Sequence, residues 1–128
     1  MSNQRLSLED FGLGLMAGLI SKSVDLVNED RRTVHPAFIA AYKVLREELG
    51  EGAIGFELKA DASGGKSSGV ERILRLWKQG YLVPARTPGT FFFVMSPTDA
   101  QRRLARIPGG RELFLKATNA FLKVYRSR

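Results

Sequence analysis

The spacing of apolar residues between Ser67 and Gln79 constrains the fold of this chain most. Val70, Ile73, Leu74 and Trp77 occur at positions i, i+3, i+4 and i+7, which is one stripe of a 3.6-period helix. The opposite face has Ser68, Arg72, Arg75 and Gln79 and no carboxylate, because Glu71 falls on the flank. The pattern predicts a helix that buries one side and offers the other to an anionic partner.

Two extended runs follow this helix at once. Gly80 occupies the position at which a left-handed residue commonly ends a helix. Tyr81 to Arg86 and Thr90 to Ser96 are rich in aromatic and β-branched residues, and the intervening Thr-Pro-Gly predicts a reversal. The sequence therefore predicts a β-hairpin directly after the helix.

The segment SSGVERILRLWKQGYLVPARTPGTFFFV, about a quarter of the chain, resembles the recognition helix and wing of winged helix-turn-helix regulators of the MarR and GntR type. It is also similar to winged-helix proteins of phage and plasmid replication and control. The resemblance implies an α+β, mainly α, fold with a small hairpin wing and extra N- and C-terminal helices. It also implies a DNA-binding function in transcription control, replication or partition.

The length of 128 residues predicts one domain, with a winged-helix core at about 8–96 and a helical extension over 97–128. The absence of cysteine excludes disulfides and thiolate metal sites, and the single histidine leaves little for a metal site or a Ser-His pair. No catalytic residue, metal or cofactor is predicted, and we do not expect an enzyme. Since the longest apolar stretch, Phe11 to Ile20, is too short to cross a bilayer and no leader precedes it, we expect a cytoplasmic protein without a membrane partner.

The positive charge is concentrated in the second half of the chain. Residues 1–60 have 7 Lys and Arg against 9 Asp and Glu, whereas residues 61–128 have 13 against 4. The net charge of +7 thus arises where the predicted recognition helix begins. This asymmetry is typical of nucleic-acid-binding proteins.

The remaining elements are predicted from caps and periodicity. Helices are expected from Leu8 to about Leu26, from Pro36 to about Leu49, from Ser96 to about Ile107 and from Arg111 to about Arg126, with a charged linker over 28–34. A short strand is expected at 54–58, followed by a loop to Ser67. His35 is interpreted as a residue at the start of the second helix.

The first and last helices are apolar around much of their circumference, and in the last helix Leu115 and Leu122 face away from the main stripe. This pattern predicts either a homodimer interface or a deep position in one core.

The candidate DNA contacts follow from the predicted helix and wing. Ser67, Ser68, Gly69 and Arg72 are expected at base edges in the major groove, with Arg75, Lys78 and Gln79 along the backbone and Lys66 on a phosphate. Arg86, Thr87 and Thr90 are expected at an adjacent minor groove or its phosphates. Arg102, Arg103 and Arg106 form either a second phosphate-contacting strip or a solvated face.

Three other interpretations are possible. A protein-interaction adaptor, or a subunit of a nucleoprotein assembly, would have the same fold. Ala60 to Ser67 fits a loose phosphate-binding loop, with Lys66 and Ser67 at the phosphate and magnesium positions, but Ala60 replaces its first glycine. Phe91 to Phe93 could stack on single-stranded bases, although strand alternation favours a core role for part of the run.

Overall fold

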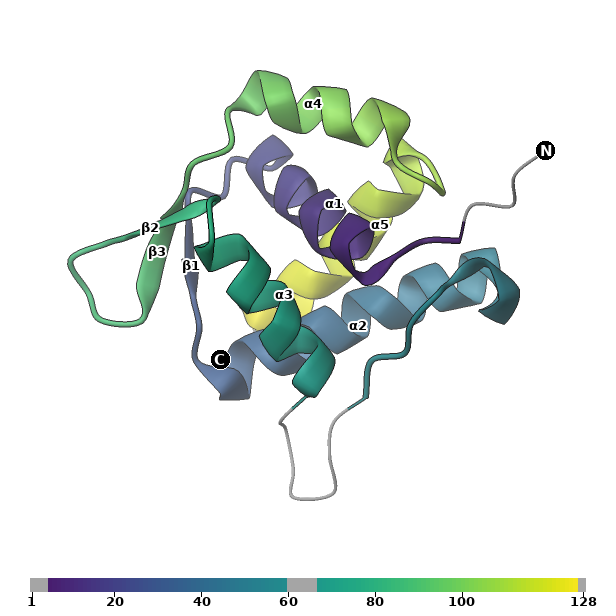
Figure 1. Ribbon diagram of the computed structural model, residues 1–128, viewed down its shortest axis with the longest axis horizontal. Coiled ribbons are helices and arrows are strands. Elements are labelled where there is room, and N and C mark those ends of the chain that lie inside the picture. The colour runs from purple at the N-terminus through teal and green to yellow at the C-terminus, as the bar shows by residue number, and fades with distance from the viewer. Residues whose placement is uncertain (1–4, 60–66, 127–128) are drawn as a thin grey trace.

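The computed structural model describes residues 5–59 and 67–126, which are mostly helical (Figure 1). The helices are α1 (Leu8–Ser21), α2 (Arg31–Leu49), α3 (Ser68–Lys78), α4 (Pro97–Arg106) and α5 (Arg111–Tyr125), with one 3₁₀ turn, η1 (Glu51–Ala53). The strands are β1 (Leu26–Asn28), β2 (Leu82–Pro84) and β3 (Thr90–Phe93). The predicted α+β, mainly α, class is confirmed.

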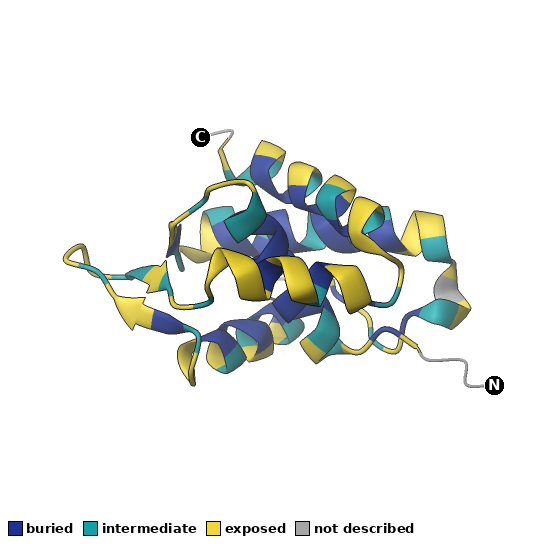
Figure 2. Ribbon diagram, turned by 90° about the horizontal axis from the view of Figure 1, so that it is seen from above, coloured by how far each residue is buried: buried dark blue, intermediate teal, exposed yellow. Residues whose placement is uncertain are grey.

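Helix α1 lies at the centre of the molecule, where α3, α4 and α5 pack on it (Figure 1). Every residue from Phe11 to Leu19 is buried, and Figure 2 shows buried residues facing inward from the surrounding helices. Glycines in α1 allow this close packing: a Cβ at Gly14 would lie 2.3 Å from Ile107 Cδ1 and 2.4 Å from Phe114 Cε2. The apolar circumference of α1 is therefore covered within one chain.

An aromatic cluster joins α2, α3 and α5. The ring of Phe38 lies 5.2 Å from that of Trp77 and 5.0 Å from that of Phe121, measured between centroids. All three side chains are buried, and Trp77 Nε1 donates a hydrogen bond to the Gly12 carbonyl at 3.1 Å. Burial of side chains this large is the main stabilising contribution to such a core. It fixes the apolar face of α3 against the body.

The three strands form one antiparallel sheet in the order β1-β3-β2. The predicted hairpin is confirmed as β2 and β3, which project from the helical body (Figures 1 and 2). At its tip Thr90 N–H donates to the Thr87 carbonyl at 3.1 Å, and Gly89 has a φ of 80°. With Pro88 before that glycine, this is the arrangement of a type II turn.

Two boundaries predicted near the N-terminus are wrong. Helix α1 ends at Ser21 rather than near Leu26, because Ser23 adopts a left-handed φ of 64° and turns the chain into β1. Helix α2 begins at Arg31, within the predicted linker, because the Asp30 side chain accepts a hydrogen bond from Arg32 N–H at 3.0 Å and caps it. Pro36 consequently lies inside the helix, not in its first turn.

The predicted strand at 54–58 is also wrong. Ile54 forms only an isolated parallel bridge with Leu6, and η1 precedes it. Leu6 N–H donates to the Ala53 carbonyl, and Gly55 N–H donates to the Leu6 carbonyl, both at 2.8 Å. The segment thus ties down the start of the chain. Most of the loop predicted after it, residues 60–66, lies outside the described residues.

Helices α4 and α5 belong to the same core as the rest of the described chain. Leu104, Phe114 and Phe121 are buried, and α5 packs along α2. Leu122, predicted to face away, is buried at 8% exposure, and Leu115 is half-buried. Of the two explanations for the wide apolar arc of α5, the deep position in one core is the one that the burial supports. A homodimer remains a prediction. The wide apolar surfaces of α1 and α5 no longer support an interface on these helices, because both surfaces are covered within one chain.

Candidate nucleic-acid interface

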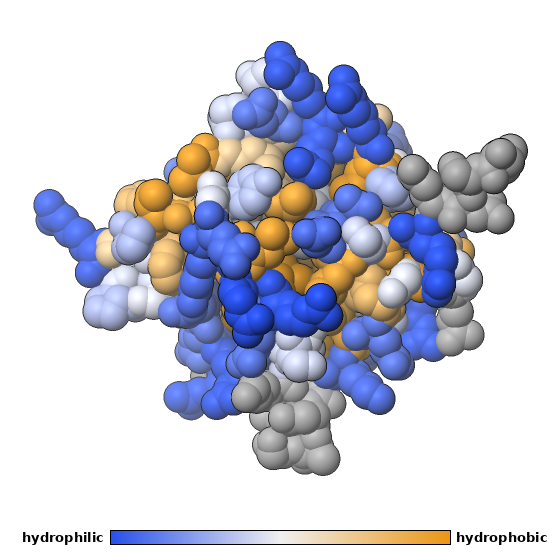
Figure 3. All heavy atoms as spheres, viewed as in Figure 1, coloured by the Kyte–Doolittle hydropathy of each residue, from blue (hydrophilic) through white to orange (hydrophobic). Residues whose placement is uncertain are grey.

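Helix α3 buries the predicted apolar stripe and exposes the predicted polar face. Val70, Ile73, Leu74 and Trp77 are buried, whereas Ser68, Arg72, Arg75, Lys78 and Gln79 are exposed. The helix lies on the face of the molecule seen in Figure 1, with the hairpin beside it. Figure 3 shows a band of hydrophilic side chains over α3 on that face. The two guanidinium groups are therefore accessible to a large partner.

The start of α3 is fixed by a buried junction with α2. Ser67 is 1% exposed, and its backbone N–H donates to His35 Nδ1 at 2.9 Å. Its hydroxyl caps the helix by accepting from Val70 N–H at 3.4 Å. A base contact by Ser67 is therefore a wrong prediction, because its side chain is inside the protein. The predicted position of His35 at the start of a helix is wrong, because α2 begins at Arg31. His35 is a buried residue within α2 that positions α3.

The glycines at the two ends of α3 have different local structures. Gly69 is half-buried, and a Cβ there would lie 2.4 Å from Leu58 Cδ2, so packing explains the glycine. Gly80 does not adopt a left-handed conformation, so the predicted glycine cap is wrong. Instead, the Tyr81 N–H donates a hydrogen bond to the Trp77 carbonyl at 2.8 Å where the chain leaves the helix. Lys66, with the rest of the phosphate-loop pattern before Ser67, lies outside the described residues.

The tip of the hairpin exposes Arg86 and Thr87. Thr90 is half-buried, and its hydroxyl accepts a hydrogen bond from Asn28 Nδ2 at 2.9 Å. The Glu29 backbone N–H donates to the Gly89 carbonyl at 2.9 Å. The tip is thus anchored to the β1–α2 turn, which holds it at a fixed position relative to α3.

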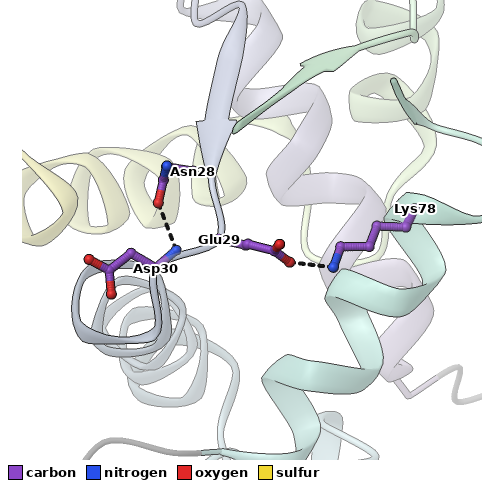
Figure 4. Close-up of polar contacts among 4 residues, drawn as sticks. All are labelled: Asn28, Glu29, Asp30 and Lys78. Carbon is purple, nitrogen blue, oxygen red and sulfur yellow. Dashed lines mark hydrogen bonds and ion pairs between the residues drawn. The ribbon is translucent and has the colours of Figure 1, made fainter. Parts of the chain in front are cut away.

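Lys78 does not project freely from the end of α3. Its ammonium is ion-paired with Glu29 (Figure 4). The same ammonium lies 5.3 Å from the centroid of the Phe91 ring. The turn that presents Glu29 is held by Asn28 Oδ1, which accepts a hydrogen bond from Asp30 N–H at 2.8 Å (Figure 4). The predicted backbone contact by Lys78 therefore competes with an existing ion pair and a cation–π contact.

Grooves lie on both sides of α3. One, of about 400 Å³, lies between α3 and the start of α1 and includes Glu9, Arg72 and Gln79. The other, of about 300 Å³, lies between α3 and the start of α2 and includes Glu29, Arg31 and His35. Arg75 lines both grooves, which places it on the ridge between them. The outer face of α3 has no carboxylate of its own, but acids lie at both of its edges: Glu9 in the first groove, and Glu29 with Glu71 of α3 in the second.

The arginines of α4 line a third groove, of about 540 Å³, next to the hairpin. Arg102, Arg103 and Arg106 form one wall, and Tyr81 and Val94 belong to the opposite side. Arg102 Nη1 lies 3.7 Å from Asp99 Oδ1, and Arg103 is half-buried. Figure 3 shows hydrophilic side chains over α4, separated by apolar surface from those over α3. The α4 arginines are accessible but form a patch distinct from that of α3.

The three phenylalanines of β3 alternate as strand geometry requires. Phe93 packs edge-on against Trp77, with 5.6 Å between ring centroids, and Phe91 lies under Lys78. Phe92 points to the other face of the sheet and is 46% exposed. The core role predicted for part of the run is confirmed for Phe93.

Sequence reasoning missed the residues that the fold brings to α3 from elsewhere. These are Glu9, Asn28, Glu29 and Arg31. Arg31 belongs to the predicted charged linker, and no local signal in the sequence places it beside a helix about forty residues later in the chain.

Comparison with protein-family models, curated proteins and solved structures finds no match to this chain. Among the described residues, no group of three or more His, Asp or Glu is arranged to hold a metal ion. In the same part of the chain, no helix has the length and apolar content needed to cross a bilayer. The function is therefore inferred from the geometry of the chain's own side chains.

Proposed function

We propose that this protein binds duplex DNA as a winged helix, with α3 in the major groove and the hairpin tip on an adjacent groove. One observation is the main support: α3 exposes Arg72, Arg75 and Gln79 beside a projecting hairpin whose tip exposes Arg86 and Thr87. An α-helix fits the major groove, and guanidinium groups bind both phosphates and guanine edges. A helix and a neighbouring ribbon can then contact the duplex at two separate places.

The residues have different expected roles. Ser68 and Arg72 belong to the first half of α3, where base contacts are usual for a recognition helix, and Arg75 and Gln79 are expected along the phosphate backbone. Arg86 and Thr87 are expected at the second contact. Within the cytoplasm, such a protein would act in transcription control or in plasmid or phage replication or partition.

The α4 arginines are expected to have a secondary role. Arg102, Arg103 and Arg106 line a groove with Asp10 and Asp99, and this groove is distinct from the two that flank α3. Mixed charge of this kind weakens attraction to phosphates. We therefore expect these arginines to add long-range attraction rather than close contacts.

The test is fluorescence anisotropy with a labelled random-sequence duplex at increasing salt. The dissociation constant for non-specific binding is expected at about 10⁻⁴–10⁻⁶ M. The logarithm of the association constant should fall linearly with the logarithm of the salt concentration, with a slope whose magnitude rises by about 0.9 for each phosphate contact. Replacing both Arg72 and Arg75 by Ala should weaken binding by at least about tenfold and lower that slope by about 2. The matched control is Lys43→Ala with Lys123→Ala, which removes two exposed cations from α2 and α5.

Equal effects of the two double variants would mean that only net charge matters. Absence of binding by the wild-type protein would favour the adaptor alternative. Stabilisation by magnesium-ATP that Lys66→Ala abolishes would favour the nucleotide-binding alternative.

A further inference from the structure

The outer face of the sheet has a row of exposed apolar side chains. The exposed large hydrophobic residues of the described chain are Leu26 at 41%, Val83 at 47%, Phe92 at 46% and Val94 at 54%. Exposed apolar side chains on a folded domain are usually scattered rather than gathered. Here all four belong to the sheet or directly follow it, so they form one surface.

Strand register places them together. Leu26 and Val83 both pair directly with Phe92, from β1 and β2 respectively. Directly opposed residues of antiparallel strands lie on the same face, and Val94, two residues after Phe92, returns to that face. Phe93, one residue away, packs against Trp77 on the inner face. We call Leu26, Val83, Phe92 and Val94 the outer row.

The row is accessible to a partner that approaches the face of the sheet. Pairing at the β2 edge is hindered by Pro84, which has no N–H to donate, and β1 has only three residues. The ion pair of Lys78 with Glu29 and its contact with Phe91 lie on the inner side. At one end the row borders the groove of the α4 arginines, which Val94 also lines. The row itself consists of apolar side chains, so we expect an apolar partner.

The size of the row limits the kind of partner. Four side chains with about half of their surface exposed offer on the order of 300 Å², since even an aromatic side chain buries only about 150–250 Å². A stable dimer buries about 800 Å² on each partner. The row is too small for a dimer in free solution. It suffices for a weak contact between molecules already held side by side.

We propose that the outer row is the contact between two copies of this chain bound at adjacent positions on one duplex. The inference rests on the proposed function, since DNA would supply the high effective concentration that a small contact requires. Consider two copies whose sheets face each other across a two-fold axis that runs parallel to β3. Phe92 of one copy then meets Phe92 of the other, and Leu26 of each copy meets Val83 of the other, so the row is complementary to itself. The hairpin tip that we assign to DNA joins β2 and β3, the strands that contain Val83 and Phe92 of the row.

The test compares a duplex of about one helical turn, which accepts one copy, with a duplex of about four turns. Wild-type protein should bind the short duplex without cooperativity and the long duplex cooperatively. Phe92→Thr should reduce the cooperativity by about tenfold and leave the short-duplex affinity within about twofold, because Thr retains strand propensity at an exposed site. Val44→Thr, a half-buried apolar position on α2, is the control and should change neither quantity.

A charge-exchange pair tests the geometry and the identity of the partner. Leu26→Glu alone should abolish cooperativity, and Leu26→Glu combined with Val83→Lys should restore it, because each Glu would face a Lys of the other copy. Sedimentation without DNA should give the same oligomeric state for the wild type and Phe92→Thr, because the row alone is too small to hold a dimer in free solution. A second copy would be the wrong partner for the row if the double variant stayed non-cooperative.

The failures are distinguishable. No binding to the short duplex overturns the proposed function and the DNA-dependent contact with it. Short-duplex binding with no cooperativity on the long duplex overturns the contact alone. Loss of short-duplex binding in a folded Phe92→Thr protein would assign the row to DNA instead.

Discussion

The ammonium of Lys78 at the end of α3 is ion-paired with the carboxylate of Glu29 in the β1–α2 turn. The backbone N–H of the same Glu29 donates to the carbonyl of Gly89 at the hairpin tip, at 2.9 Å. One residue therefore connects the end of the candidate recognition helix to the tip of the candidate wing. This connection fixes the geometry of the site, but it also puts a negative charge beside a surface that we expect to meet phosphates.

Neutralising Glu29 should strengthen DNA binding. Glu29→Gln removes the negative charge, frees Lys78 and keeps the backbone bond to Gly89, so affinity for a random duplex at low salt should rise about two- to fivefold. Anisotropy measures the change, with Glu47→Gln on the exposed side of α2 as the charge-matched control. A fall in affinity would mean that the ion pair is needed for the bound geometry.

His35 should position α3 by accepting the hydrogen bond from Ser67 N–H. His35→Leu removes the acceptor and leaves a buried N–H unpaired, which should lower the free energy of unfolding by about 1–3 kcal/mol. His35→Asn offers an oxygen near the position of Nδ1 and should lose less. Urea unfolding gives both values. Equal losses in the two variants would show that ring volume, not the hydrogen bond, is what matters.

Gly14 should resist replacement although it lies inside a helix. Alanine favours helices over glycine by about 1 kcal/mol, but its Cβ would collide with Ile107 and the buried ring of Phe114. Overpacking of this kind costs about 1–3 kcal/mol, so Gly14→Ala should be destabilised in urea unfolding. Gly52→Ala, whose Cβ meets nothing within 4 Å, should change stability by less than about 0.5 kcal/mol. A stabilised Gly14→Ala protein would contradict the packing described for α1.

The parts of the fold with strong local signals could be predicted from the sequence. Helix α3 has a complete i, i+3, i+4, i+7 stripe, and α4 has Ser96 as its cap and Pro97 in its first turn. The hairpin has a Thr-Pro-Gly turn with glycine at the position that requires a positive φ. In each case the local preference and the tertiary structure agree.

The rest depends on contacts between distant parts of the chain. Strand β1 has only three residues, too few for alternation to appear, and it forms by pairing with β3 more than sixty residues later. Pro36 suggested a helix start, but the Asp30 cap begins α2 earlier. The burial of Ser67 depends on His35, 32 residues away, and the acids beside α3 come from the start of α1 and the β1–α2 turn. Local patterns identify α3 as a candidate but do not identify what surrounds it.

The most direct test of DNA binding by α3 and the hairpin tip is backbone amide NMR of the labelled protein titrated with a short duplex. We predict the largest shift changes over residues 68–79 and 86–90, smaller ones over α4, and almost none over the exposed faces of α2 and α5. Changes centred on α2 and α5, or spread evenly over all exposed cations, would contradict the proposed interface.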